Sequence, residues 1–267
     1  MDLYTQSGLV TYQLYVSPNI LPSSRVLSTM PSRMWIDIDM RLSFELLEIL
    51  EEVSYMLASI KNDVSKSDEL EIKTYFEIAS GSIINAMLFG TRFDETNLQD
   101  LYNVKTSLAK CIHLFMHPAL IIAATFPNTV GKLPFFRGYI DKLMKHAGVM
   151  FGYFDKQIEQ HEKCFDPNSV EEDGKDFVEV YLKEIYKMKD KDGHYFTKPQ
   201  LRNLCLDLWA GAFENIANTF AWAMLYLIYN PEVQRKIHEE LDAVISSDRL
   251  VTLGDKTQLP YMNAFIC

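Results

Sequence analysis

The amino-acid sequence predicts an all-α fold, and three observations support this class. One stretch, Thr197 to Asn230, has the features of a single helix about 32 residues long, or about 48 Å at 1.5 Å per residue. Apolar residues recur at helical spacing in several other segments. No segment has a convincing strand pattern. A helix this long is expected to run through the centre of the protein.

The composition limits both the size of the fold and the class of function. The chain has 267 residues, 48% of them hydrophobic, which is enough for one large domain or two small ones. Its net charge of −10 argues against a nucleic-acid partner. The four cysteines are scattered and lack CxxC spacing, which favours reduced thiols. His113 and His117 are four residues apart, but no third ligand accompanies them, so no metal-ion site built from side chains is predicted.

The N-terminal segment, residues 1–40, has no sustained helical period. Met1 to Arg33 is polar and interrupted by prolines, so neither a signal peptide nor a membrane anchor is expected there. The most apolar stretch, Ile216 to Tyr229, is too short and too polar at its entry to span a bilayer.

From residue 41 onward the pattern becomes helical. Apolar residues at helical spacing predict a helix over Leu42 to Ile60. Asp68 and Glu71 form a plausible capping box for a second helix, which Gly90 closes. Leu98 to His113 is a third predicted helix.

The middle of the chain begins with an apolar segment, Phe115 to Phe136, which contains three prolines and almost no charge. One interpretation of this segment is a buried connector. Arg137 to Lys163 is predicted to form an amphipathic helix, and Cys164 to Lys175 an acidic, flexible loop. Asp176 and Glu179 are expected to cap a further helix.

The long predicted helix has clear boundaries. Thr197 is a helix-capping residue type, and Pro199 sits early, where a missing N–H costs little. Asn230 precedes Pro231 and is therefore expected to end the helix. Pro231 starts another helix, and Ser246 to Cys267 is predicted to be mostly loop, with a helix beginning at Tyr261.

The centre of the long helix carries one carboxylate, Glu214, among small residues. Its helical neighbours include Ala210, Gly211 and Ala217, and a mid-helix glycine costs about 0.5–1 kcal/mol relative to alanine. A strip without side chains is suited to a flat ligand lying against the helix. The alternative is a carboxylate that is hydrogen-bonded inside a helical core.

Several runs carry a resemblance to a known family. They are Asp207-Leu208-Trp209, Gly211-Ala212-Phe213-Glu214-Asn215, Asn230-Pro-Glu-Val-Gln-Arg-Lys-Ile-His-Glu-Glu-Leu-Asp and Leu259-Pro-Tyr-Met-Asn-Ala264. In this order they resemble the central distal helix of the cytochrome P450 family, of the microsomal animal type, and the segments that follow it. The resemblance covers 41–267 as a partial cytochrome P450 domain, whereas residues 1–40 show none.

The resemblance implies a haem monooxygenase that oxidises small lipophilic compounds and uses a reductase. Glu214 and Asn215 would be catalytic, Ala210, Gly211 and Ala212 would lie against haem, and Trp209 and Phe213 would shape the substrate side. Phe115 to Phe136 would then be a substrate-access lid that dips into a membrane surface. The endoplasmic reticulum membrane is the implied location, and the cytoplasm is the alternative because no N-terminal anchor is expected.

The sequence departs from the family pattern in three respects. Asn215 stands where the family has a threonine, and Gly211-Ala212 reverses the usual order of the small pair. An asparagine side chain donates a hydrogen bond but has no hydroxyl to pass a proton. No Phe-x-x-Gly-x-x-x-Cys-x-Gly loop, which would hold the haem iron, is found in the sequence. We therefore expect a truncated chain that is inactive by itself; the alternative function is a non-catalytic helical protein that binds a ligand or a partner.

Overall fold

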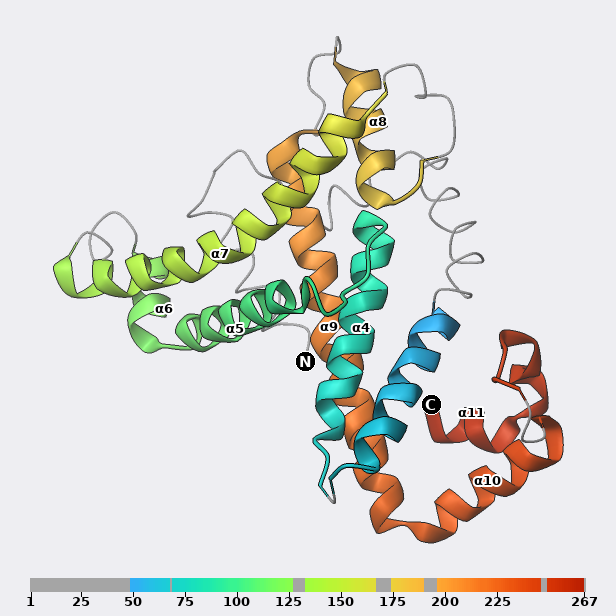
Figure 1. Cartoon of the computed structure of the whole chain (residues 1–267). Helices are drawn as coiled ribbons and strands as arrows, with labels where there is room; N and C mark the ends of the chain where they lie inside the picture. The colour runs from blue at the N-terminus through green and yellow to red at the C-terminus, as the bar shows by residue number, and fades with distance from the viewer. Residues whose placement is uncertain are drawn as a thin grey trace. The chain divides into compact units, whose positions relative to one another are not determined.

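The computed structural model describes residues 49–67, 69–126, 133–166, 174–189, 196–245 and 249–266. Within these ranges the secondary structure is helical and no strand occurs, so the predicted all-α class is confirmed. Residues 49–64 form the first described helix. The labelled helices are α4 (Ile72–Phe89), α5 (Leu98–Phe115), α6 (Pro118–Thr125), α7 (Pro134–Cys164), α8 (Phe177–Met188), α9 (Lys198–Tyr229), α10 (Pro231–Ile245), the 3-10 helix η3 (Leu253–Gln258) and α11 (Pro260–Ile266) (Figure 1).

The chain folds as two compact units. The described part of the first unit lies within Ser80–Phe213, and that of the second lies within Leu47–Ala79 and Glu214–Cys267. Both α4 and α9 contribute residues to each unit.

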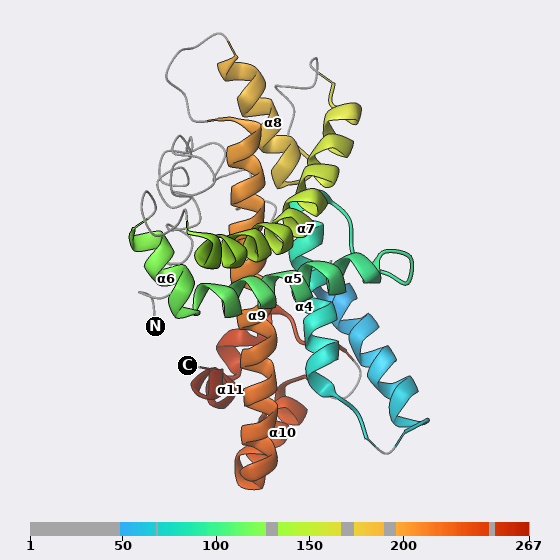
Figure 2. The same ribbon diagram turned by 90° about the vertical axis from the view of Figure 1, so that its left-hand side faces the viewer.

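In the first unit, α5 and α7 lie side by side, and α6 packs against both (Figure 2). The buried residues of α5 and α7 recur mainly at three- and four-residue spacing, so each helix turns one mostly apolar stripe inward. They are Leu101, Val104, Ser107 and Cys111 on α5, and Leu143, Ala147, Met150, Phe151, Tyr153, Phe154 and Ile158 on α7. The amphipathic helix predicted over Arg137 to Lys163 is therefore confirmed, with three further residues at its start and one at its end.

Gly81 of α4 and Gly90 directly after it have separate roles in packing and in termination. A Cβ at Gly81 would lie 2.9 Å from Leu101 Cδ1 and 3.3 Å from the Phe213 ring, so a larger residue would require these two side chains to shift. Gly90 ends the helix with a φ of +64°, and its N–H donates to Ala86 O at 2.7 Å. The predicted closure of this helix at Gly90 is confirmed.

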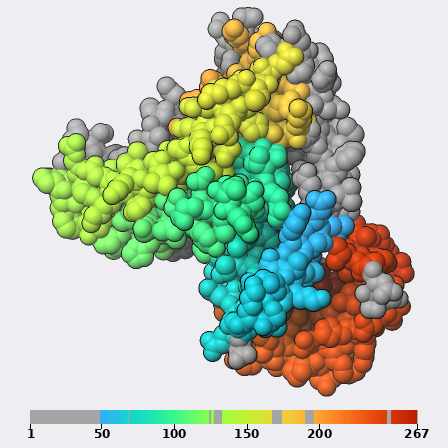
Figure 3. Space-filling view, viewed as in Figure 1, coloured from blue at the N-terminus to red at the C-terminus, as the bar shows by residue number. Residues whose placement is uncertain are grey.

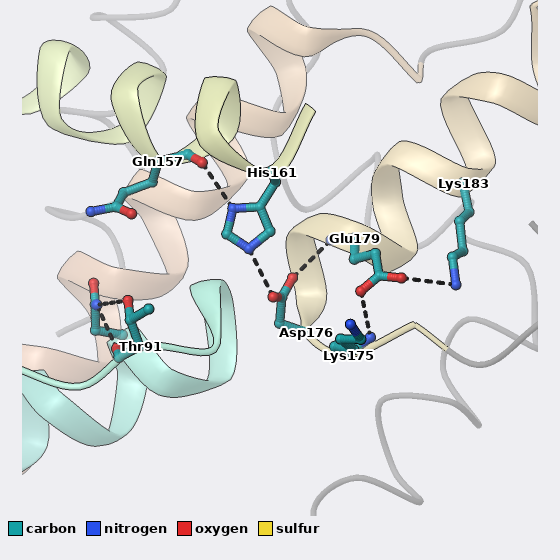
Figure 4. A network of polar contacts seen from close by, with 8 residues as sticks. Thr91, Gln157, His161, Lys175, Asp176, Glu179 and Lys183 are labelled. Carbon is teal, nitrogen blue, oxygen red and sulfur yellow. Dashed lines mark hydrogen bonds and ion pairs between the residues drawn. The ribbon is translucent and has the colours of Figure 1, made fainter. Parts of the chain in front are cut away.

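The start of α8 is fixed by the predicted cap. Asp176 Oδ1 accepts a hydrogen bond from Glu179 N at 2.8 Å, and Glu179 Oε2 accepts one from Lys175 N at 2.9 Å. The other oxygen of Asp176 lies 2.8 Å from Nε2 of His161, in the last turn of α7 (Figure 4). One carboxylate therefore caps α8 and joins it to α7.

The long helix α9 has the bounds that the sequence predicts. It contains 32 residues, from Lys198 to Tyr229, and Thr197 Oγ1 accepts a hydrogen bond from Gln200 N at 3.3 Å. The chain leaves the helix at Asn230, directly before Pro231.

In the second unit, the helix over 49–64 meets the first turn of α4. Tyr75 OH donates to Asp63 Oδ2 at 2.8 Å, and the Phe76 ring stacks on Phe220 of α9 at 5.3 Å. Glu240 of α10 accepts hydrogen bonds from the Tyr261 and Met262 N–H groups, both at 2.8 Å, and so caps α11 from a neighbouring helix.

Three predicted segments need correction. After Ser246, the helix predicted to begin at Tyr261 is confirmed as α11, but the rest of the described region is not mostly loop, because η3 precedes α11, Thr252 and Asp255 form its capping box and Arg249 binds the same carboxylate. Cys164 ends α7 and does not begin a loop. The described parts of the segment from Phe115 to Phe136, residues 115–126 and 133–136, contain α6 and the first turn of α7, and several of their side chains are exposed, so these parts are not a buried connector.

Other predictions fall outside the described residues. They concern residues 1–40, the helix start before residue 49, Asp68 as a cap and most of the loop after Cys164.

Candidate functional site on helix α9

The middle of α9 has two faces of opposite character. Trp209, Phe213 and Ala217 are buried, whereas Gly211, Glu214 and Asn215 are exposed. At 100° per residue, Trp209 and Gly211 are about 200° apart around the helix. The sequence-predicted site residues are therefore on one helix but not on one surface.

The buried face contributes to the core of the first unit. The Trp209 and Phe213 rings stack with their centroids 4.6 Å apart, and Trp209 also meets the edge of Phe154 on α7. Ser80 Oγ of α4 donates to Phe213 O at 3.2 Å. These contacts fix the rotation of α9 about its axis. Contact of Trp209 and Phe213 with a substrate stays a prediction.

The exposed face has the small surface that the sequence predicts. A Cβ added at Gly211 would meet no atom within 4 Å, and Ala210 and Ala212 are half-buried on its two flanks. Glu214 is exposed, so the alternative in which it is hydrogen-bonded inside a helical core is wrong. Thr219, one turn after Asn215, donates its hydroxyl to Asn215 O at 2.8 Å.

The small residues of this face leave room for a flat group, whose binding stays a prediction, and two of the cysteines do not fit the role of an iron ligand. Gly211 with its flanking alanines leaves room for one side of a planar group. Cys111 and Cys205 are buried; burial raises the pKa of the Cys111 thiol to about 11 and, with the nearby charge of Asp176, raises the pKa of Cys205 well above its usual value. Both are therefore protonated thiols, whereas a thiolate is the form that binds iron. Cys164 is exposed at the end of α7.

The structure also contains two hollows that the sequence did not indicate. One, of about 740 Å³, lies in the second unit between the end of α9, α10 and α11, with Trp222, Tyr226 and Phe265 in its lining. The other, of about 500 Å³, lies between α5 and α7 in the first unit. Both bring together residues from different helices, so no single helical pattern identifies them.

The described part of the chain contains neither a metal-ion cluster nor a membrane-spanning helix. There, no group of three or more histidine, cysteine, aspartate or glutamate side chains has the arrangement of a metal-ion site. None of the described helices combines the length and apolar character that crossing a bilayer requires.

Comparison with known proteins gives one consistent result. The sequence model of the family described as Cytochrome P450 matches residues 37–267. The chain is 30% identical to Cytochrome P450 2U1 of Rattus norvegicus over 221 residues, which cover 82% of this chain and 39% of that protein. It is 32% identical to Cytochrome P450 1A2 of Macaca fuscata fuscata over 194 residues, 71% of this chain and 35% of that protein.

A third relative, Cytochrome P450 2J5 of Mus musculus, is 29% identical over 220 residues, 82% of this chain and 41% of that protein. The chain thus matches about two fifths of the length of these curated relatives. The family match covers most of the chain, including the whole of α9 with its exposed small face. This chain therefore belongs to the cytochrome P450 family.

Proposed function

We propose that the protein acts as a haem-dependent monooxygenase on small lipophilic compounds, and that α9 supplies the wall on the distal side of the cofactor. One observation carries this proposal: in a chain of this family, Gly211, Glu214 and Asn215 share an exposed face of α9 while Trp209 and Phe213 anchor the opposite face. Haem, when bound, supplies the activation of dioxygen.

The residues of the exposed face have distinct proposed roles. Ala210, Gly211 and Ala212 allow close approach of a flat group. Glu214 holds a solvent-accessible carboxylate that moves protons toward the cofactor side. Asn215 donates a hydrogen bond from its side-chain amide but passes no proton, which makes Glu214 and water the proton route.

The partners and location follow from the family and from the first unit. A reductase is the proposed electron donor. The exposed apolar side chains between Met116 and Phe135 support peripheral contact with a membrane, which agrees with an endoplasmic reticulum location for the family. Family membership does not favour the alternative of a non-catalytic binding protein.

The test uses a chimaera, because this chain matches only part of its relatives. Residues 1–267 are joined to the remaining C-terminal part of rat Cytochrome P450 2U1, and product and peroxide are measured per reducing equivalent. General acid–base assistance is typically worth about 10²–10⁴ in rate, so Glu214→Gln should lower the product-to-peroxide ratio strongly. Asn215→Thr should raise it, because a hydroxyl adds a second proton route.

The matched control is Glu159→Gln, which removes the same charge from an exposed position on α7. It should leave the ratio unchanged. An unchanged ratio for both Glu214→Gln and Asn215→Thr would show that this face of α9 does not border the reacting oxygen. A chimaera that binds haem but forms no product from any lipophilic substrate tested would contradict the monooxygenase assignment.

A further inference from the structure

The carboxylate of Asp176 lies at a junction of several helices of the first unit. There the end of α7 and the helix α8, coloured yellow and gold in Figure 3, lie side by side. Asp176 is 6% exposed; its Oδ1 accepts a hydrogen bond from Glu179 N in α8, and its Oδ2 lies 2.8 Å from Nε2 of His161 in α7. A Cβ at Gly90, directly after α4, would lie 3.2 Å from the same Oδ2. Groups of the protein therefore surround this carboxylate.

The contact between His161 and Asp176 depends on a single proton. Nδ1 of the imidazole lies 2.8 Å from Gln157 O, and a carbonyl oxygen, like a carboxylate, only accepts hydrogen bonds. A ring with a hydrogen on each nitrogen donates to both oxygens. In a neutral ring, the nitrogen without a hydrogen would point its lone pair at one of them. Because both nitrogens are engaged, His161 is not placed to act as a base on a ligand.

The negative charges around His161 favour the protonated ring. Burial, the largest single effect, lowers the pKa of His161, but the hydrogen bond and the charge of Asp176 oppose it. The Gln157 carbonyl and the charge of Glu179 act in the same direction as Asp176, and together they leave the pKa raised. From the end of α4, the uncharged Phe89 ring faces the imidazole, with the two ring centres 6.2 Å apart. The junction thus holds a proton that a histidine in water loses near about pH 6.5.

The lysines near the junction have other partners. Glu179 is flanked by Lys175 and Lys183 (Figure 4), and Lys183 Nζ lies 3.0 Å from its Oε1. Lys198, the first residue of α9, pairs with Glu162, which follows the imidazole in α7. In the part of the junction that the structure describes, the imidazole is therefore the cation in contact with the capping carboxylate.

Packing connects the start of α8 to the start of α9. Tyr181 of α8 is buried, and the centre of its ring lies 5.2 Å from that of Phe196. Phe196 directly precedes Thr197, which caps α9. Cys205 of α9 adds no charge to the junction, because burial and then the charge of Asp176 raise the pKa of its thiol. A displacement of α8 would therefore reach the first turn of α9.

We propose that the His161–Asp176 contact is a proton-dependent latch, which fixes the first turn of α8 to the end of α7 and releases it when the imidazole loses a proton. While the ring is protonated, a charge-assisted hydrogen bond joins the two helices. After deprotonation, the buried carboxylate loses its positive partner, and a lone pair faces either it or Gln157 O.

The direction of the pH dependence follows from the raised pKa of His161. The latch is complete below about pH 6.5, the value for an unfolded chain, and opens as pH rises through the higher folded-state pKa. The latch involves neither haem nor the exposed face of α9, so it is independent of the proposed oxygenase function.

Hydrogen exchange of the 267-residue chain, followed by mass spectrometry, tests the latch. Exchange rates measured from about pH 6 to about pH 9 are divided by the intrinsic rates at each pH, which leaves the protection by structure. The amides of Glu179 and Val180 report on the latch, because they donate to Asp176 Oδ1 at 2.8 Å and Asp176 O at 3.1 Å. Their protection should fall by about 10- to 100-fold as pH rises, the range of a hydrogen bond to a charged group. Amides in the middle of α5 should lose far less.

Three variants separate the latch from a general loss of stability. His161→Gln removes the titrating group and should make the protection of α8 independent of pH. His146→Gln, at a half-buried position on the same helix, is the matched control and should keep the full decrease. Asp176→Asn keeps a side chain that can cap α8 but removes the charge, so the decrease should move to lower pH. Far-UV circular dichroism checks that each variant keeps its helix content.

Three results would overturn the latch. They are an unchanged decrease in His161→Gln, an equal decrease in the amides of α5, and an unchanged midpoint in Asp176→Asn. The nitrogen-15 resonances of the His161 ring in the unchanged chain give a test that needs no variant to fold. Two protonated ring nitrogens at about pH 6 and one at about pH 9 are expected, whereas two across the whole range would make the contact purely structural. The oxygenase function is read separately, from the product-to-peroxide ratio of the chimaera.

Discussion

At the scale of single residues, His161 lies between two hydrogen-bond acceptors that determine its protonation. Its Nδ1 lies 2.8 Å from Gln157 O, and its Nε2 lies 2.8 Å from Asp176 Oδ2. Both neighbours are acceptors, so only the protonated ring, with a hydrogen on each nitrogen, satisfies both contacts. Burial lowers the pKa of His161, but the hydrogen bond and charge of Asp176, with the Gln157 carbonyl, outweigh it and leave the pKa raised.

The raised pKa of His161 predicts a pH-dependent stability. The folded-state pKa exceeds the unfolded value of about 6.5, so the stabilisation is complete below about pH 6.5 and is lost as pH rises through the folded pKa. Urea denaturation at a series of pH values should show the free energy of unfolding falling across this window. His161→Gln should remove that part of the pH dependence, whereas His238→Gln on α10 should retain it. The same pH profile in the His161 variant and the unchanged chain would contradict the prediction.

At the scale of elements, α9 is one helix with two environments. Its first half presents a buried stripe to the core of the first unit, and its last turns present large exposed side chains, including Phe220, Trp222 and Tyr229. The helix contains two tryptophans that differ in this respect: Trp209 is 0% exposed and Trp222 is 70% exposed. Because both residues are tryptophans of the same helix, substituting each of them compares the effect of burial alone.

We expect truncation of these two tryptophans to have very different costs. Trp209→Ala leaves a cavity beside Phe154 and Phe213 and should lower the free energy of unfolding by about 3–5 kcal/mol. Trp222→Ala, at an exposed position, should change it by about 0.5 kcal/mol or less. Chemical denaturation of the two variants measures both values. Similar losses for the two would show that Trp222 is covered in solution.

The environments of the cysteines predict the absorption spectrum of the chain mixed with haem. Cys111 and Cys205 are buried protonated thiols, and we expect neither Cys164 nor Cys267 to act as the iron ligand. The purified 267-residue chain, mixed with haem, reduced and treated with CO, should therefore lack the red-shifted thiolate-type Soret band. Rat Cytochrome P450 2U1 is the positive control. A stoichiometric thiolate-type spectrum from this chain alone would overturn the assignment of its cysteines.

At the scale of the whole molecule, the described part of the second unit has large exposed apolar side chains at the end of α9. Trp222, Ile228 and Tyr229 are each at least 70% exposed, and they adjoin or line the hollow of about 740 Å³ beside α10 and α11. Large exposed apolar surfaces drive association in water.

The isolated chain is therefore expected to associate as its concentration rises. Light scattering with size-exclusion chromatography should show species larger than the 30.9 kDa monomer, and Trp222→Ser with Ile228→Ser should shift them toward the monomer. The control is Ile121→Ser with Ile122→Ser, which removes exposed apolar side chains from the first unit. A monomer at all concentrations, with a sharp cooperative thermal transition, would count against this prediction.

Local sequence signals predicted the fold class and most helix boundaries. Thr197, Pro231, Asp176 and Gly90 act on backbone groups within a few residues of themselves, so their effects are readable without knowledge of the fold. The sequence motifs within α9 and in the segments that follow it likewise identified the family. The 3-10 helix η3 was missed although its Thr252–Asp255 box is local, because it lies in a segment with no helical apolar period.

The tertiary structure decided which side of each helix faces inward and which residues of different helices meet. Trp209 and Glu214 are both within the central motif, yet packing against Phe154 and Phe213 buries the tryptophan, while Glu214 stays exposed. α9 is apolar around most of its circumference, so periodicity alone could not select the buried side. The hollow between α5 and α7 and the His161–Asp176 contact join residues 15 to 41 positions apart, and only the packing of α5, α7 and α8 brings them together.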